Sequence, residues 1–151
     1  MKISTITRYG LRAMVNLAMY YYNENKYIPL SYIAKKEEIS MRYLENIMTK
    51  LITAGLVLSR KGKYGGFTLS KSPEKIKVSE ILKALEGDMT PVFCISDPTL
   101  CKRVSICSTY ELWLQLYKDI WSLLDSKTLA QLAKGGKNKL EGLLLKKGRI
   151  S

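Results

Sequence analysis

Histidine is absent from the 151 residues of this sequence, and its absence excludes several kinds of site. Without an imidazole the chain cannot form a Ser-His-Asp or Cys-His nucleophile system, a histidine zinc ligand or an imidazole pH switch. The remaining residues contain no acid–base or nucleophile constellation either, so we do not expect an enzyme.

Long apolar runs are also missing. No stretch approaches the roughly 18 apolar residues of a membrane span. Arg8 and Arg12 interrupt the apolar residues near the start, so no signal-peptide core forms. We therefore expect a cytoplasmic protein without a membrane partner. In that reducing compartment the three cysteines are expected to be thiols, redox sensors or metal ligands rather than structural disulfides.

Acidic residues are scarce, with 13 Asp+Glu against 25 Lys+Arg and a net charge of +12. The basic excess lies in residues 1–63 and 134–151, whereas the segment between them is neutral. A basic segment beside a neutral one indicates a polyanionic partner, most often nucleic acid. The length predicts one domain, or a small domain with an appended dimerisation element.

A helix-turn-helix pattern occupies the basic segment. An amphipathic helix capped by Ser4 or Thr5 is predicted to residue 22, and a short helix is predicted over residues 30–36. A three-residue turn leads to Ser40, which has the position of an N-cap. The helix that follows ends at Gly55. Its buried stripe has helical spacing and comprises Leu44, Ile47, Met48 and Leu51.

Two short strands are predicted directly behind this pattern, over residues 56–60 and 67–70. The glycine-rich connection between them carries Lys61 and Lys63 at its tip. A basic hairpin after a helix-turn-helix is typical of the wing of a winged-helix domain. We therefore predict a mostly α fold with a small β-wing, in which a short helix over residues 78–86 completes a DNA-binding domain of residues 1–87.

The rest of the chain is predicted to contain a cysteine-bearing loop, 88–108, a dimerisation-helix region, 109–133, and a basic, mobile tail, 134–151. The long helix of that region is expected over about 109–124, and a short helix over 128–133. Burial of its broad apolar stripe against a second copy is favoured, and packing onto the first helix of the same chain is the alternative. The stripe comprises Leu112, Trp113, Leu116, Ile120, Leu123 and Leu124.

Five segments resemble the Rrf-type family of bacterial transcriptional regulators, which contains IscR, NsrR and CymR. They are TRYGLRAM at 7–14, IA at 33–34, ISMRYLENI at 39–47, LITAGLV at 51–57 and RKGKYGGFTL at 60–69. The resemblance covers about residues 1–133 and is strongest to the IscR type. It implies a homodimer with two winged domains, a long crossed dimerisation helix and a ligand or cluster loop before that helix.

The loop cysteines decide the type of regulator within this family. Cys94, Cys101 and Cys107 have six and five residues between them, and members that bind iron–sulfur clusters are similar in carrying three loop cysteines. Thiolates are the preferred ligands of such clusters. We expect an iron–sulfur cluster, 2Fe–2S rather than 4Fe–4S. The alternative is three unrelated thiols, or a Cys101–Cys107 disulfide formed on oxidation.

Neither fourth ligand known in the family is present. IscR-type members place a histidine three residues after the third cysteine, where this chain has Tyr110. NsrR-type members use an acidic residue near the start of the partner subunit, where this chain has Arg8. An exogenous thiol or water could take this place. The candidates within the chain are Asp97, Ser108, Tyr110 and Glu111.

The resemblance implies a dimeric regulator, which we expect to be a repressor. Its binding to double-stranded operator DNA is expected to depend on the cluster. The alternatives are a clusterless CymR-like regulator of cysteine and sulfur metabolism, and a redox protein that only carries a cluster. Glu45 matches an IscR residue that discriminates between operator types. The residues expected to reach base edges are Ser40, Arg42, Tyr43 and Glu45. Those expected at phosphates or the minor groove are Arg8, Lys50, Arg60, Lys61 and Lys63.

Overall fold

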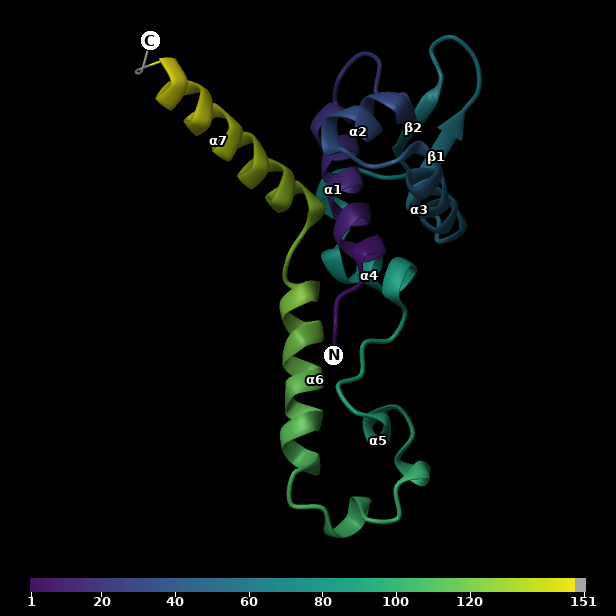
Figure 1. The fold of residues 1–151 in the computed structure, drawn as a ribbon, viewed down its shortest axis with the longest axis vertical. Coiled ribbons are helices and arrows are strands. Elements are labelled where there is room, and N and C mark those ends of the chain that lie inside the picture. Colours follow the sequence, from purple (N-terminus) through teal and green to yellow (C-terminus); the bar gives the residue numbers. More distant parts are fainter. Residues whose placement is uncertain (149–151) are drawn as a thin grey trace.

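The structure is a computed structural model that describes residues 1–148. Its helices are α1 (Thr5–Tyr20), α2 (Leu30–Glu37), α3 (Met41–Thr53), α4 (Val78–Glu86), α5 (Phe93–Ser96), α6 (Tyr110–Asp125) and α7 (Leu129–Gly148). The strands are β1 (Val57–Arg60) and β2 (Gly66–Leu69), and three 3₁₀ turns cover Pro73–Lys75, Pro98–Leu100 and Val104–Ile106. Helices α1–α4 and the hairpin form a winged domain at one end, and α6 leads away from it to the loop that carries α5 (Figure 1). The prediction of a mostly α winged fold is confirmed.

Serine side chains cap the first turns of α1 and α3 and so determine where these two helices begin. The Ser4 hydroxyl accepts from the Thr7 amide at the start of α1, and the Ser40 hydroxyl accepts from the Tyr43 amide at the start of α3. Each such cap is worth about 1 kcal/mol. Gly55 follows α3 with a φ of 74°, a conformation that favours glycine. The predicted starts and the end of α3 are confirmed.

The wing is an antiparallel hairpin closed against the segment before α2. Val57 pairs with Leu69 and Arg60 pairs with Gly66. Ile28 and Phe67 exchange two backbone hydrogen bonds of 2.9 Å, which attach the hairpin to the helical part of the domain. Gly66 lies at this junction with a φ of 141°, and a Cβ there would lie 2.3 Å from the Ile28 carbonyl oxygen. The sequence therefore needs glycine at residue 66 to close the wing.

Helix α6 divides its apolar residues between two environments. Ile120, Trp121 and Leu124 pack against a small cluster in the same chain that comprises Val78, Leu82 and Met89. In contrast, Leu112, Leu116 and Leu123 remain 61%, 38% and 59% exposed. Packing onto the first helix of the same chain was the alternative to a dimer, and the same-chain contacts of α6 occur mainly on α4 instead. The stripe of Leu112, Leu116 and Leu123 therefore stays exposed within the described residues.

The chain returns to the winged domain after α6. The Val78 amide donates to the Lys127 carbonyl (2.9 Å), and the Leu129 amide donates to the Ile76 carbonyl (2.8 Å). The Leu129 side chain is completely buried in the main core, among residues of the winged domain. The start of α7 therefore completes the core that residues 1–87 begin.

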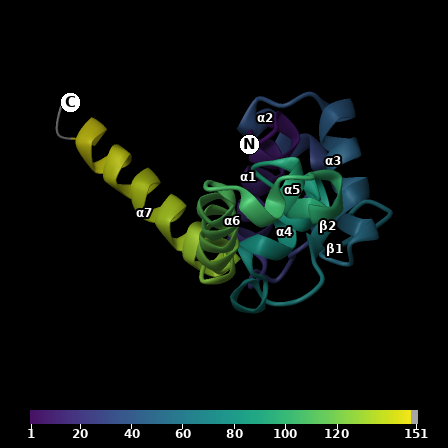
Figure 2. The ribbon, with the colours of Figure 1, turned by 90° about the horizontal axis from the view of Figure 1, so that it is seen from below.

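Helix α7 corrects the predicted end of the chain. The expected short helix does not end at residue 133 but continues to Gly148, so residues 134–148 are helical. The expected mobility of the tail stays a prediction. Gly135 and Gly136 do not break the helix, because Gly136 packs closely against Met19 of α1. Beyond this contact α7 leads away from the remainder of the molecule (Figures 1 and 2). The last part of the predicted tail, residues 149–151, lies outside the described residues.

Over residues 1–148, none of the helices is both long and apolar enough to cross a membrane.

Candidate nucleic-acid interface and cysteine loop

Helix α3 presents a polar face to solvent and buries the opposite one. Leu44, Ile47, Met48 and Leu51 are buried, as predicted. Arg42, Glu45 and Lys50 are all exposed. A recess of about 360 Å³ at the start of the helix is lined by Ser40, Arg42, Tyr43 and Asn46. The structure thus brings the four expected base-reading residues to one exposed helix end.

Two of these four residues also have structural contacts. The Ser40 hydroxyl accepts the Tyr43 amide proton at 3.2 Å, which leaves its own O–H proton free to donate. The Tyr43 ring packs edge-on against Tyr9 with centroids 5.8 Å apart. Tyr43 is therefore held by α1, and only part of its ring faces solvent.

The wing presents its lysines differently from its arginine. Lys61 and Lys63 are exposed at the tip. Arg60 donates from Nη2 to the Tyr64 carbonyl at 2.8 Å, and its guanidinium carbon lies 3.9 Å from the Tyr27 ring centroid. Such cation–π stacking fixes the guanidinium over the ring. Arg60 therefore links the wing to Tyr27 and to the Tyr64 backbone, a structural role that the sequence did not indicate. Its expected contact with a phosphate stays a prediction.

Lys50 lies near a carboxylate that the sequence did not indicate, whereas Arg8 is exposed on the first turn of α1. Arg8 donates from Nη2 to the Thr5 hydroxyl at 3.2 Å and is otherwise exposed. The Glu86 carboxylate accepts from the Ser4 amide at 3.1 Å, from the Ser4 hydroxyl at 2.6 Å and from the Thr7 hydroxyl. The Ser4 and Thr7 hydroxyls, with Lys50 nearby, lower the pKa of Glu86. Glu86 thus joins the end of α4 to the start of α1.

The cysteine loop lies at the opposite end of α6 from the winged domain (Figure 1). Cys94 lies on α5, whereas Cys101 and Cys107 each follow a 3₁₀ turn, and all three are free and partly buried. The Cys107 sulfur lies 3.4 Å from the Thr109 hydroxyl, and this contact lowers the pKa of the thiol. Within residues 1–148, no three Cys, Asp or Glu side chains are gathered to hold a metal ion. Three thiols are suitable donors for an iron–sulfur cluster, but in this structure the three cysteines are not gathered around one point.

The fourth-ligand candidates have unequal freedom. The Asp97 carboxylate accepts from the Thr99 amide at 3.0 Å and from the Thr99 hydroxyl at 2.6 Å, so it caps the local turn. Ser108 and Glu111 are exposed, and Tyr110 is partly buried at the first position of α6. Ser108, Tyr110 and Glu111 all lie within four residues of Cys107. Arg8 lies on α1 in the winged domain instead.

Comparison with known proteins gives one consistent result. Residues 3–135 match the Rrf2 family, described as an iron-dependent transcriptional regulator. The chain is 39% identical to the transcriptional regulator CymR of Bacillus subtilis over 133 residues, covering 88% of this chain and 90% of the relative.

Two solved structures show the same likeness. The structure of B. subtilis CymR, the global cysteine regulator, matches with a TM-score of 0.74 at 36% identity, covering 89% of this chain and 97% of that chain. The structure of T. potens IscR matches with a TM-score of 0.71 at 34% identity, covering 90% and 88%. CymR and IscR match about equally well, so the expected preference for the IscR type is not borne out. With its recognition helix and wing in place, this chain belongs to the Rrf2 family and is a DNA-binding transcriptional regulator, not an enzyme.

Proposed function

We propose that the protein is a homodimeric repressor whose operator binding responds to the loop cysteines through an iron–sulfur cluster. The observation that carries the proposal is the pairing of a basic recognition helix and wing with a separate loop that holds three free thiols. The exposed stripe of Leu112, Leu116 and Leu123 on α6 supports association with a second copy. Two recognition helices related by a twofold axis would read a palindromic operator.

The wing lysines supply the first test. Replacing Lys61 and Lys63 together by alanine should weaken binding to all duplex sequences. It should also lower the slope of log K against log salt by about 1.8, because each phosphate contact contributes about 0.9. Fluorescence anisotropy over a salt series measures both effects. The matched control replaces Lys146 and Lys147 in the last turn of α7, which removes the same charge away from the wing. A slope equal to that of the unmodified protein would rule out wing contacts with the backbone.

Glu45 supplies a test of sequence reading. Its carboxylate can accept from a cytosine amino group, and it repels base acceptors and phosphates. Glu45→Ala should therefore broaden the consensus selected from a random DNA library, since a good base contact gives roughly 1–3 kcal/mol of discrimination. Glu24→Ala, on an exposed turn, should leave the consensus unchanged. If Glu45→Ala lowers affinity uniformly and preserves the consensus, Glu45 does not read bases.

Cys94, Cys101 and Cys107 would hold the cluster, and Ser108, Tyr110 or Glu111 would lie nearest to its remaining position. When bound, a cluster supplies a link among the three thiolates that is sensitive to iron and oxidants. This chain's own contribution is a loop of short turns that can bring the thiols together.

Anaerobic reconstitution followed by absorption and Mössbauer spectra tests this assignment. Each single Cys→Ala variant should lose the visible absorbance and still form a folded dimer, and Ser105→Ala in the same loop should keep it. A cysteine variant with full iron and sulfide content would exclude that cysteine as a ligand.

A clusterless CymR-like regulator is the second candidate, favoured by the likeness to CymR. In that case the reconstituted protein would remain colourless, and its affinity for DNA would be the same with and without iron and sulfide. A redox protein that only carries a cluster would instead show no operator selection from the library.

A further inference from the structure

Helix α7 carries exposed leucines beyond its contact with α1. Leu140 still lines a recess together with Met19 and Tyr20. Residues 141–148, here called the α7 arm, then lead away from the rest of the molecule (Figures 1 and 2). Leu143 and Leu144 are neighbours on this arm, and each is more than half exposed. Large apolar side chains that adjoin on a surface indicate a place where a partner packs.

The α7 arm gains little stability from its own sequence. Isolated helices of fewer than roughly 12–15 residues are marginal in water, and Gly142 lowers the helix propensity further. The arm also lies beyond residues 3–135, which match the Rrf2 family. Burial of its leucines against another surface would therefore stabilise it.

The cysteine loop has exposed apolar side chains of its own. Phe93, Leu100 and Ile106 are each more than half exposed. The loop precedes the start of α6, whereas the α7 arm lies beyond the end of α6, so the two surfaces are far apart within one chain (Figure 1). They can cover each other only between two copies.

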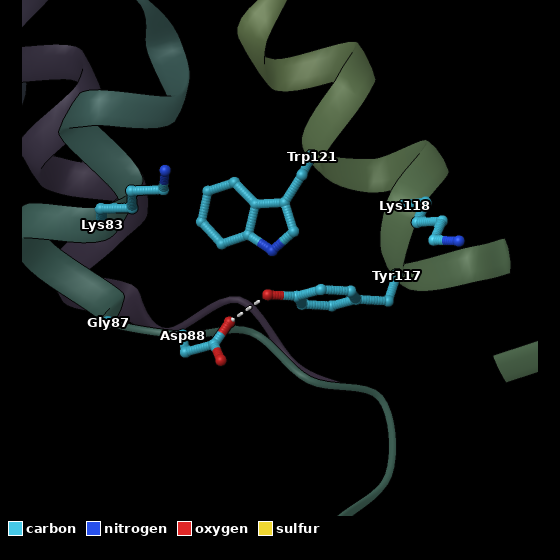
Figure 3. Close-up of a pocket in the computed structure, with 6 residues that line it drawn as sticks. All are labelled: Lys83, Gly87, Asp88, Tyr117, Lys118 and Trp121. Carbon is cyan, nitrogen blue, oxygen red and sulfur yellow. Dashed lines mark hydrogen bonds between the residues drawn. The ribbon is translucent and has the colours of Figure 1, made fainter. Parts of the chain in front are cut away.

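The direction of the exposed stripe on α6 determines where a second copy lies. Trp121 extends from α6 toward Lys83 on α4 (Figure 3). At 3.6 residues per turn, the residues of α6 that pack on the α4 side lie about 110° around the helix axis from the exposed stripe. The stripe therefore faces roughly perpendicular to the direction from α6 to α4. It comprises Leu112, Leu116 and Leu123.

A twofold axis that passes through the middle of this stripe, perpendicular to α6, exchanges both the ends and the sides of the helix. In one chain the cysteine loop lies on the same side of α6 as α4, and α7 leaves on the opposite side (Figures 1 and 2). The rotation therefore brings the loop of the second copy to the side and the end of α6 from which α7 extends. The midpoint of the stripe falls between residues 117 and 118. Residue 107 of one copy is then level with residue 128 of the other, each about 16 Å from the midpoint.

Charge favours this antiparallel arrangement over a parallel one. The basic excess of residues 1–63 lies in the winged domain, at one end of α6. A parallel pair would bring two such domains side by side, and their like charges would repel. An antiparallel pair separates them and also places the positive end of each helix dipole beside the negative end of the other.

The stripe on α6 is small for a stable dimer. A helix of 16 residues is about 24 Å long, and a contact strip about 10 Å wide gives about 240 Å² per copy. Stable interfaces bury roughly 800 Å² on each partner. A dimer held by α6 therefore needs further contact surface, and the two arms and two loops of such a dimer can supply it.

We propose that the α7 arm of each copy packs on the cysteine loop of the other copy. Leu143 and Leu144 of the arm cover apolar side chains of the loop, Ile106 among them. This inference rests on the homodimer of the proposed function. It gives the loop a direct influence on the dimer, because any rearrangement of the loop changes the surface on which the partner's arm packs.

Sedimentation equilibrium of the full, metal-free chain over a dilution series tests this contact. Leu144→Ser should raise the Kd of the dimer at least about thirtyfold, because two buried leucines are lost per dimer. Leu145→Ser is the matched control, since Leu145 is exposed and lies about 150° around the helix from the other two leucines. It should change the Kd by less than about twofold. Circular dichroism shows whether each variant is folded.

A double-mutant cycle identifies the surface that the arm covers. Ile106→Ser should also raise the Kd, and combining it with Leu144→Ser should have an effect at least about threefold smaller than the product of the two single effects. Effects that simply multiply would overturn the proposal. A loss of affinity for duplex DNA in Leu144→Ser with an unchanged Kd would assign the arm to DNA and would also overturn it.

Leu116→Asp separates this contact from the dimer itself. This change places a charge in the stripe on α6 and should abolish the dimer. If it does so while Leu144→Ser leaves the Kd unchanged, the homodimer of the proposed function stands and the arm contact is wrong. A Kd that survives Leu116→Asp would reject the dimer through α6 and the arm contact with it.

Discussion

Gly66→Ala is expected to destabilise the protein by about 2–4 kcal/mol, because a strained backbone and a steric clash coincide there. The φ of 141° lies in a region that side chains disfavour, and the added Cβ would meet the Ile28 carbonyl oxygen at 2.3 Å. The hydrogen bonds between Ile28 and Phe67 must then break or shift. Urea unfolding measures the loss, and the affinity for DNA should fall with it because the wing loses its support.

Gly62→Ala is the matched control in the same hairpin. Its φ is 104°, but no atom lies within 4 Å of an added Cβ. We expect a loss of only about 1 kcal/mol from backbone strain alone. Equal losses for the two variants would show that the contact with Ile28 does not constrain the wing.

Leu129→Ala is expected to lower the free energy of unfolding by about 2–5 kcal/mol, the range of buried leucine truncations. Leu129 is fully buried in the main core although it lies far along the chain from the winged domain. Chemical denaturation followed by circular dichroism checks this. Leu140→Ala on the same helix, where the side chain is 51% exposed, should change stability by less than about 0.5 kcal/mol. A small loss at Leu129 would mean that α7 does not contribute to the core.

The sequence predicts the features that depend on nearby residues. Ser40 and the stripe from Leu44 to Leu51 determine α3 by capping and periodicity, and both are local signals. The glycines and the two lysines of the hairpin likewise indicate a wing before any contact is known. The residues expected to read bases could be proposed for the same reason, because they follow from the start of one helix, and their role stays a prediction.

Features that depend on distant partners escape such reasoning. Gly135 and Gly136 each lower helix propensity by about 1 kcal/mol, which favours a break. Helix α7 nevertheless continues through both glycines, and at Gly136 it lies close to Met19 of α1. Arg60 stacks on Tyr27, a residue 33 positions earlier, and no spacing rule connects them. The cysteines identify sulfur as the donor atom, but their spacing does not predict where the three sulfur atoms lie in the folded loop.

The backbone pairing between residues 76–78 and 127–129 has a mechanical consequence for α6. The start of α6 is joined to α4 by the cysteine loop. Its end is held to the winged domain by this pairing, which begins two residues after Asp125. Its 16 residues therefore form a lever of about 24 Å with its pivot at the paired segment. We expect a displacement at the cysteine end to be transmitted to α4 through this pairing and through the packing of Ile120, Trp121 and Leu124 on the Val78–Leu82–Met89 cluster.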